Sequence, residues 1–469
     1  MLERKMLGRL KEWRSRNAAR TSGPRKAFLL DGPRQTGKTY VIRQLGAEYR
    51  DFVEVNFLED AEAASLVRQC TSARELVSAL SLLAGREVSP GGALVFFDEV
   101  QEAPDIVAQA KFLADDGRFD VALSGSLLGV ELRDVRSFPV GYVEEATMHP
   151  LDFEEFARSQ GATDEVLGQV RRAYDEGRPL DAPLHDRLTR LFRLYLVVGG
   201  MPEAVQRYVD TRYDLGAVRE VQARISSQYR ADISKYARGR ELQVRAIYDA
   251  LPSQLAQENK RFQLRRIKDK ATYERYANDF AWLVAAGAAL KCNVVAEPAY
   301  PLQRTEERRR FKLYASDQGM LLSQYPVGMA ARALEGARDV NFGAVYENAV
   351  AQELAAAGVP LRYFHNNRKG EVDFLVEDRE GRVVPVEVKS GKDYKFHTAL
   401  NNLLGTEAYG IDFAVVLSEA NVSVGERAGK PVRYLPLYMA HCIAADAAAG
   451  AGREGSAFLS ALDAAPPSF

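Results

Sequence analysis

The stretch Leu29-Leu30-Asp31-Gly32-Pro33-Arg34-Gln35-Thr36-Gly37-Lys38-Thr39, LLDGPRQTGKT, decides the fold of the first part of the chain. The apolar run from Lys26 to Gly32 predicts a buried strand, and the sequence TYVIRQLGAEY that begins at Thr39 predicts an amphipathic helix. The residues between them follow the pattern G-x4-G-K-T. A strand, this loop and a helix in succession are typical of a phosphate-binding loop.

The loop has the chemistry that a nucleoside triphosphate requires. Its two glycines allow backbone N–H groups to turn toward phosphate oxygens, and the dipole of the following helix adds positive potential. Lys38 would reach the β- and γ-phosphates of ATP, and the hydroxyl of Thr39 would bind Mg2+. The candidate nucleotide-binding residues of the loop are Gly32, Pro33, Arg34, Gln35, Thr36, Gly37, Lys38 and Thr39.

Two further stretches support this site. The run ALVFFDEV predicts a buried strand that ends in Asp98 and Glu99, whose side chains would both reach the ligand crevice at the strand's carboxyl end. Asp98 would join the nucleotide site and hold Mg2+ through water, and Glu99 would polarise the attacking water. Ser124, in LSGS after the next strand, would hydrogen-bond the γ-phosphate or that water, although serine is also a common turn residue.

The composition is that of a globular protein without a global attraction to nucleic acid. The 469 residues carry a net charge of −1, so any such binding must come from a local basic patch. The three cysteines, Cys70, Cys292 and Cys442, lie far apart, which argues against disulfides or zinc and predicts a reducing, cytoplasmic setting. Because no apolar run reaches about 18 residues, we expect no transmembrane span and no membrane partner.

A second candidate site lies in the region 335–443. Asp373 ends the motif EVD on one predicted strand, and Glu387 and Lys389 share a face of the next strand, VEVKS. With Glu347 from the preceding helix, the carboxylates would form an oxygen site for Mg2+ or Mn2+. Lys389 would orient or activate the attacking water. This D…ExK pattern resembles the PD-(D/E)xK nucleases, while VEVKS is also compatible with an ordinary edge strand of alternating charge.

A basic segment, Asn259 to Tyr276, suggests contact with nucleic acid. It holds seven lysines and arginines, and a second basic arm, RTEERRRFK, begins at Arg304. Helix, helix and two strands with a charged tip resemble a winged helix, with the arm as its wing. Such a patch would contact phosphates and would fix position rather than read sequence. A solvated helix face and a protein–protein module remain open as alternatives.

The motifs together resemble a known family. LLDGPRQTGKT, FFDEVQ, LSGS, HPLDFEEF and GGMPEAV occur in an order and spacing similar to AAA-type ATPases with a C-terminal domain of the DUF4143 kind, over residues 20 to 440. The resemblance implies an AAA+-like core, a winged helix and a nuclease-like C-terminal fold. Tyr142 stands where the family usually has arginine, which leaves Arg193 or Arg230 as candidate arginine fingers and the expected oligomer open.

We therefore predict an α/β protein with a P-loop NTPase parallel sheet, a helical lid, a winged-helix segment and an α/β restriction-endonuclease-like C-terminal domain. The predicted boundaries are 1–163 for the ATPase core, 164–240 for the lid, 241–325 for the winged helix, 335–443 for the nuclease-like domain and 444–469 for a flexible tail.

Two functions remain open. In the first, ATP hydrolysis controls a metal-dependent nuclease that acts on DNA or RNA, with Asp373, Glu387 and Lys389 as its catalytic residues. In the second, the chain is a nucleotide-driven switch or scaffold whose C-terminal domain binds nucleic acid or protein without cleavage. A metabolic kinase is disfavoured, because the Asp98-Glu99 pair at a strand end is typical of ATP hydrolysis.

Overall fold

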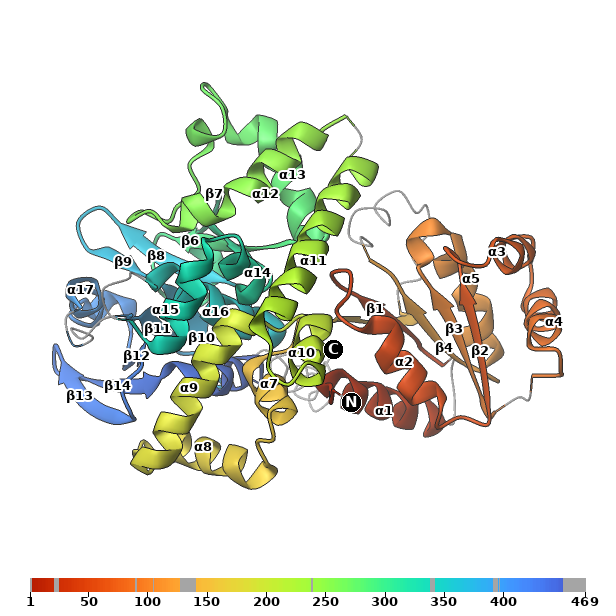
Figure 1. The fold of residues 1–469 in the computed structure, drawn as a ribbon, viewed down its shortest axis with the longest axis horizontal. Coiled ribbons are helices and arrows are strands. Elements are labelled where there is room, and N and C mark those ends of the chain that lie inside the picture. The colour runs from red at the N-terminus through yellow and green to blue at the C-terminus, as the bar shows by residue number, and fades with distance from the viewer. Residues whose placement is uncertain are drawn as a thin grey trace, which may run out of the picture. The chain divides into compact units, whose positions relative to one another are not determined.

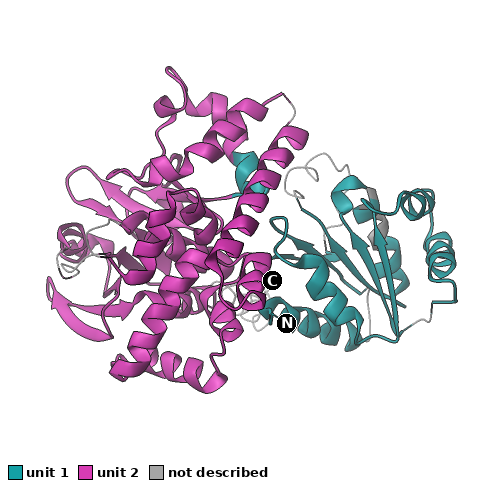
Figure 2. Ribbon diagram, viewed as in Figure 1, with its two compact units in different colours: residues 1–149, 281–288 teal, residues 150–280, 289–469 magenta. Residues whose placement is uncertain are grey.

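The computed structural model describes residues 2–20, 25–88, 91–103, 105–126, 141–237, 239–337, 342–390, 395 and 397–449. The chain forms two compact units, which Figure 2 distinguishes by colour. Unit 1 comprises residues 1–149 and 281–288, and unit 2 comprises residues 150–280 and 289–469. Among the described residues, no helix has the length and apolar character needed to cross a bilayer.

Unit 1 is built on one parallel sheet, four of whose strands are labelled in Figure 1. The strand order is β2-β3-β4-β1-β5. Its strands are β1 Ala27–Asp31, β2 Asp51–Asn56, β3 Ala93–Asp98, β4 Asp120–Ser124 and β5 Val143–Thr147. Its helices include α1 Lys5–Ala18, α2 Lys38–Gly46, α3 Ala61–Arg68, α4 Ala73–Ala84 and α5 Asp105–Asp116. The sequence prediction of a parallel sheet in this region is confirmed.

Helices cover both faces of this sheet, and alternate residues of β1 contact different layers. Phe28 and Leu30 belong to a core cluster with Trp13 of α1 and Val41 of α2. Leu29 belongs to a second cluster, which holds residues of α3, α4 and α5. Because side chains alternate along a strand, a strand buried on both faces reads as the continuous apolar run seen in the sequence.

Unit 2 combines a helical region with two sheets. The helices include α7 Phe153–Ser159, α8 Asp164–Glu176, α9 Ala182–Val198, α10 Pro202–Asp210, α11 Leu215–Tyr236, α12 Glu241–Leu255, α14 Gln318–Ser323, α15 Val327–Glu335, α16 Gly343–Ala356 and α17 Thr398–Leu404. Helix α13 Tyr273–Ala285 begins in unit 2, and its residues 281–285 belong to unit 1. The first sheet has the order β7-β6-β8-β9, from β6 Ala289–Val295, β7 Glu306–Ala315, β8 Arg362–Asn366 and β9 Gly370–Val372. The second has the order β10-β11-β12-β14-β13, from β10 Phe374–Glu377, β11 Val383–Val388, β12 Ala414–Ser418, β13 Ser423–Arg427 and β14 Lys430–Pro436.

One sheet joins regions that the sequence assigned to separate domains. The hairpin β6–β7 falls in the predicted winged helix, yet β6 pairs in parallel with β8 of the predicted nuclease-like domain. Residues 306–310, predicted to lie at the tip of a wing, lie in strand β7 instead. The boundary between the two domains, and the winged helix itself, stay predictions.

The start of the predicted flexible tail is ordered. Residues 440–449 are helical, and Ala444 and Ala447 are buried. The prediction of a loose segment from residue 444 is therefore wrong for residues 444–449, because these alanines pack into the interior of unit 2. Residues 450–469 lie outside the described part of the chain.

Candidate nucleotide site and C-terminal charged cluster

The phosphate-binding loop has backbone angles that explain its glycines. Gly32 and Gly37 adopt φ of +135° and +91°, a region that favours glycine. A Cβ on Gly32 would lie 2.4 Å from the carbonyl oxygen of Met148, so the loop also has no room for a larger residue there. The chain enters the loop from β1 and leaves it into α2 at Lys38, which places the amides of the loop at the N-terminus of α2.

Lys38 lies folded onto the loop. Its Nζ donates to the carbonyl oxygens of Gly32 (3.0 Å) and Pro33 (2.8 Å). The side chain is buried, and burial lowers the pKa of the ammonium group to about 8, against the opposing effects of Glu99 and Asp98. A bound phosphate that replaced the two carbonyls as partner would favour the charged ammonium group and would raise the pKa of Lys38 again.

Asp98 is the centre of a hydrogen-bond network at the carboxyl ends of three strands. The Thr39 hydroxyl donates to Asp98 Oδ2 (2.8 Å), and Ser124 Oγ donates to Asp98 Oδ1. Asn56, at the end of β2, lies 3.5 Å from the same carboxylate. Burial raises the pKa of Asp98. Because a hydroxyl and a carboxylate oxygen are the ligands that Mg2+ prefers, Thr39 and Asp98 fit a bound magnesium ion.

Glu99 follows Asp98 in the left-handed region, with φ of +55°. Its carboxylate accepts a hydrogen bond from the amide of Gln101. The Gln101 amide also lies 3.5 Å from Ser126 Oγ, which accepts from Arg34 Nε at 3.2 Å. A continuous chain of polar contacts therefore links the phosphate-binding loop to Glu99.

Several residues of this candidate site were not predicted from the sequence. Gln101, Ser126 and Asn56 received no role, although FFDEVQ offered a signal in the glutamine that follows the acidic pair. Arg4 was missed as well: its guanidinium donates to the carbonyl oxygens of Thr36 (2.5 Å) and His149 (2.6 Å). No sequence motif marks Arg4, because its partners are backbone atoms far along the chain.

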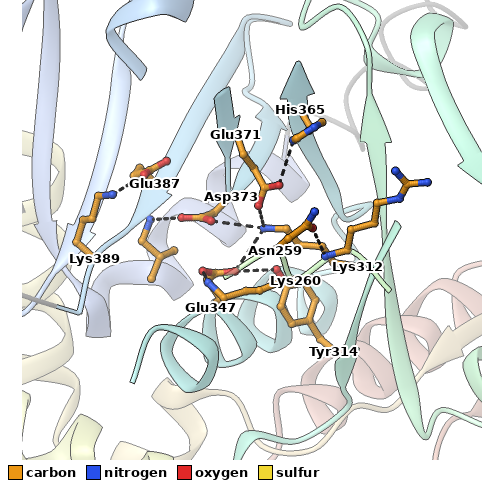
Figure 3. A network of polar contacts seen from close by, with 12 residues as sticks. Asn259, Lys260, Lys312, Tyr314, Glu347, His365, Glu371, Asp373, Glu387 and Lys389 are labelled. Carbon is orange, nitrogen blue, oxygen red and sulfur yellow. Dashed lines mark hydrogen bonds and ion pairs between the residues drawn. The ribbon is translucent and has the colours of Figure 1, made fainter. Parts of the chain in front are cut away.

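The predicted residues of the C-terminal site do lie in one cluster (Figure 3). Asp373 stands between β9 and β10, and its Oδ2 accepts from the backbone N–H of Val388 (2.9 Å) on β11. Glu387 Oε1 pairs with Lys389 Nζ at 2.7 Å, and Glu387 Oε2 is buried without a hydrogen-bond partner in the part of the chain that the structure describes. Burial raises the pKa of both Asp373 and Glu387.

Two lysines that were not predicted to belong to this cluster add their positive charge to that of Lys389. Lys312 of β7 is wholly buried and lies 3.4 Å from Glu347, 2.7 Å from Glu371 and 3.5 Å from Asp373. Lys260 pairs with the other oxygen of Glu347. Although burial works to raise the pKa of Glu347, these two lysines hold it below its ordinary value.

As the side chains stand, the cluster does not fit a divalent cation. Both oxygens of Glu347 contact an ammonium group, and Oε2 also accepts from the Tyr314 hydroxyl at 3.2 Å. One oxygen of Asp373 faces Lys312 and the other a backbone amide. Within the described ranges, no group of three or more acidic, histidine or cysteine side chains is placed to hold a metal ion. The metal roles predicted for Glu347, Asp373 and Glu387 stay predictions.

Comparison with protein families finds matches over three ranges of the chain. Residues 24–157 match an AAA domain, and residues 342–438 match DUF4143, a domain of unknown function. The chain carries an AAA domain and a DUF4143 domain. Between them, residues 189–330 match DUF8612, a further domain of unknown function. No curated protein matches the sequence.

Solved structures that resemble the chain are distant. The Walker-type ATPase PABY2304 of Pyrococcus abyssi is 15% identical, covers 69% of this chain and 96% of its own, and has a TM-score of 0.42. Cdc6p from Pyrobaculum aerophilum is 15% identical (71% and 93% covered, TM-score 0.27). The Aeropyrum pernix ORC1 protein, solved in complex with DNA, is 16% identical (72% and 93%, TM-score 0.26). The AAA match supports ATP binding and hydrolysis by the nucleotide site.

The basic segment between the AAA and DUF4143 domains divides into two parts. Lys260 is half-buried and pairs with Glu347 of the charged cluster. The other six cations are exposed: Arg261, Arg265, Arg266, Lys268, Lys270 and Arg275. The two candidate arginine fingers have acidic partners within unit 2, since Arg193 pairs with Glu419 and Arg230 with Asp249.

Proposed function

We propose that the AAA domain binds ATP with Mg2+ at residues 32–39 and hydrolyses it. The observation that carries this proposal is the meeting of Lys38, Thr39, Asp98 and Glu99 at the carboxyl ends of β1 and β3, where ligands bind in open parallel sheets. A chance turn would require neither the positive φ of both glycines nor the partly buried Thr39–Asp98 hydrogen bond.

Each residue of this site has a distinct task in the proposed reaction. The loop amides and Lys38 would bind the β- and γ-phosphates, and Thr39 and Asp98 would hold the magnesium ion. Bound magnesium supplies positive charge that stabilises the phosphates as negative charge develops on them. Ser124 fixes the orientation of Asp98, and Glu99 would accept the proton of the attacking water once its carboxylate turns from Gln101.

An ATPase assay tests this proposal. Lys38→Ala should abolish turnover and weaken ATP binding by at least about 100-fold, because the ammonium and its charge-assisted hydrogen bonds are lost. Lys11→Ala is the matched control, since Lys11 lies on α1 of the same unit and pairs with Glu48 on the surface. Failure of the folded wild-type protein to bind ATP with magnesium would overturn the proposal.

A second candidate activity is contact of the basic segment with the phosphate backbone of DNA or RNA. The exposed cations within residues 261–275 favour it, together with exposed Arg308 and Arg309 of β7. Binding of this kind releases counterions, so the affinity should fall steeply with salt. The double variant Arg265→Glu/Arg266→Glu should weaken binding and lower the salt slope by about 2.

Fluorescence anisotropy with labelled single- and double-stranded DNA and RNA would measure this binding. The matched control is Arg172→Glu/Arg178→Glu, which reverses two exposed cations elsewhere in unit 2. If both double variants bind like the wild type, or if the wild type binds none of the four probes, the segment is a solvated surface or a protein-binding surface instead.

For the DUF4143 domain, the contacts of Lys312 favour the switch or scaffold alternative over the nuclease. In the proposed switch, ATP turnover in the AAA domain changes what unit 2 binds, and no phosphodiester is cleaved. The catalytic roles of Asp373, Glu387 and Lys389 stay predictions, to be tested by nuclease assays with Mg2+ and with Mn2+. If the wild type cleaves a nucleic acid and Asp373→Ala does not, the nuclease hypothesis would be supported over the switch. Oligomerisation also stays a prediction.

A further inference from the structure

Lys312 is a fully buried charge among three carboxylates. It has no solvent-exposed surface, and its Nζ lies 2.7 Å from Glu371, 3.4 Å from Glu347 and 3.5 Å from Asp373 (Figure 3). These carboxylates come from different elements: α16, β9 and the junction between β9 and β10. A buried ammonium group is tolerated only when such partners replace its hydration shell, and the same holds for the carboxylates.

The charge balance of the cluster shows what the lysines contribute. Four carboxylates, Glu347, Glu371, Asp373 and Glu387, lie beside three ammonium groups, those of Lys260, Lys312 and Lys389. If all seven groups are ionised, the cluster carries a net charge of −1, whereas the four carboxylates alone would carry −4. A divalent cation in a site of this kind would serve the same electrostatic purpose.

We infer that the ammonium group of Lys312 occupies the place that a divalent cation would take, and that the cluster is a metal-independent ion-pair centre. A magnesium ion requires about six oxygen ligands in close to octahedral geometry. The oxygens of Glu347 and Asp373 that face Lys312 already contact donors. Of the oxygens of Glu347, Asp373 and Glu387, Glu387 Oε2 alone is buried without a hydrogen-bond partner among the described residues, and one oxygen cannot hold the ion.

Lys312 is also held in place. It lies on β7, where it is paired with Cys292 of β6, and its Nζ lies 5.0 Å from the centroid of the Tyr363 ring on β8. Entry of a divalent cation would require this buried ammonium to leave, because two positive charges at contact distance repel strongly in a medium of low dielectric constant. The cluster therefore connects β7 to the C-terminal region through charge instead of presenting an open metal site.

A manganese titration of the nucleotide-free, full-length protein tests this inference independently of ATP turnover. Bound Mn2+ is measured by electron paramagnetic resonance in the wild type and in Asp373→Asn. We expect the two proteins to bind the same number of manganese ions, and we expect a chelator to leave the wild-type unfolding temperature unchanged. The inference would be overturned if the wild type bound one manganese ion per molecule more than Asp373→Asn.

The stability of Lys312→Met tests the role of the charge. This substitution keeps an unbranched side chain but leaves buried carboxylates without their counter-charge, so the unfolding temperature should fall by about 5–10 °C. The matched control is Lys291→Met, on the neighbouring strand β6, where the ammonium donates to the Arg308 carbonyl (3.0 Å). The double variant Lys312→Met/Glu347→Gln should recover part of the loss.

The outcomes separate cleanly. Lys312→Met as stable as Lys291→Met would refute the proposed charge role, as would a double variant no more stable than Lys312→Met. If Lys312→Met does not fold, recovery of folding in the double variant supports the inference. If neither variant folds, the wild-type manganese titration decides, and its result does not depend on whether the AAA domain hydrolyses ATP.

Discussion

ATP binding should weaken as the pH rises above about 8, because Lys38 then loses its proton in the nucleotide-free protein. Burial lowers the pKa of Lys38 from 10.5 to about 8. Contact with the phosphates favours the charged ammonium and raises this pKa again. The charged form, which binds phosphate, therefore predominates below pH 8 and must be regenerated by proton uptake above it.

The size of the effect follows from these two pKa values. The lowered pKa corresponds to about 3 kcal/mol of unfavourable free energy for the charged lysine in the empty site. If the ordinary pKa is restored in the complex, ATP binding takes up about 0.75 proton at pH 8.5 and about 0.1 proton at pH 7. The dissociation constant should rise by nearly tenfold per pH unit between the two pKa values.

Calorimetric titration in two buffers of different ionisation enthalpy measures the protons directly. Above pH 7.5 the terminal phosphate of ATP has already lost its own proton and contributes little. Lys11→Ala should retain the uptake, whereas Lys38→Arg should show none, because arginine stays charged throughout this range. An affinity that does not change between pH 7 and pH 9.5, or no proton uptake at pH 8.5, would refute the assignment of Lys38 as a buried phosphate ligand.

Three further outcomes are expected. Glu99→Gln should lower ATP turnover at least about 100-fold in a single-turnover assay and leave ATP affinity within about threefold, because the proton acceptor is lost but the phosphate contacts remain. Gln101→Leu should raise basal turnover severalfold by releasing the Glu99 carboxylate, and the Glu99→Gln/Gln101→Leu double variant should stay inactive. Gly200→Ala should destabilise unit 2 by about 3 kcal/mol in urea unfolding, because its Cβ would lie 2.1 Å from the Leu151 carbonyl oxygen, whereas Gly168→Ala in α8 has open space and should not destabilise it.

The candidate nucleotide site could be predicted from the sequence because its parts are local. Residues 32–39 are contiguous, and the acidic pair closes a continuous apolar run, so a strand end and its ligands appear in a single short window. The contact of Ser124 with Asp98 depends on the sheet as well. It follows from the position of β4 between β3 and β1, and strand order is not encoded in any short stretch of sequence.

The lysines of the C-terminal cluster could not be assigned in the same way. Lys260 and Lys312 precede Glu347 by 87 and 35 residues, and their contacts arise from the pairing of β7, β6 and β8. A signal was nevertheless present. The second half of β7, Phe311 to Ala315, is buried at every position, so a lysine inside this apolar run required buried carboxylate partners.

The family motifs outside the nucleotide site act through buried backbone contacts. In HPLDFEEF, the Leu151 N–H donates to the carbonyl oxygen of Gly200 in GGMPEAV (2.7 Å). The Leu151 carbonyl accepts from the Tyr195 hydroxyl (2.7 Å) and the Gln352 amide (3.2 Å), and the Phe153 N–H donates to Glu353 Oε1 (2.8 Å). Sequence comparison identifies these motifs, but only the fold shows that they close one interior network with α16.

The peptide chain passes from unit 1 into this network over residues 149–151. The loop contacts the end of unit 1 through Arg4, which bridges Thr36 and His149, and the N–H of Met148 donates to Asp31, the residue before the loop (2.8 Å). Because Leu151 is fixed in the interior network, Pro150 alone separates two constrained segments, and its ring restricts φ. Pro150 is therefore the single residue between the backbone of unit 1 that contacts the loop region and the interior network of unit 2.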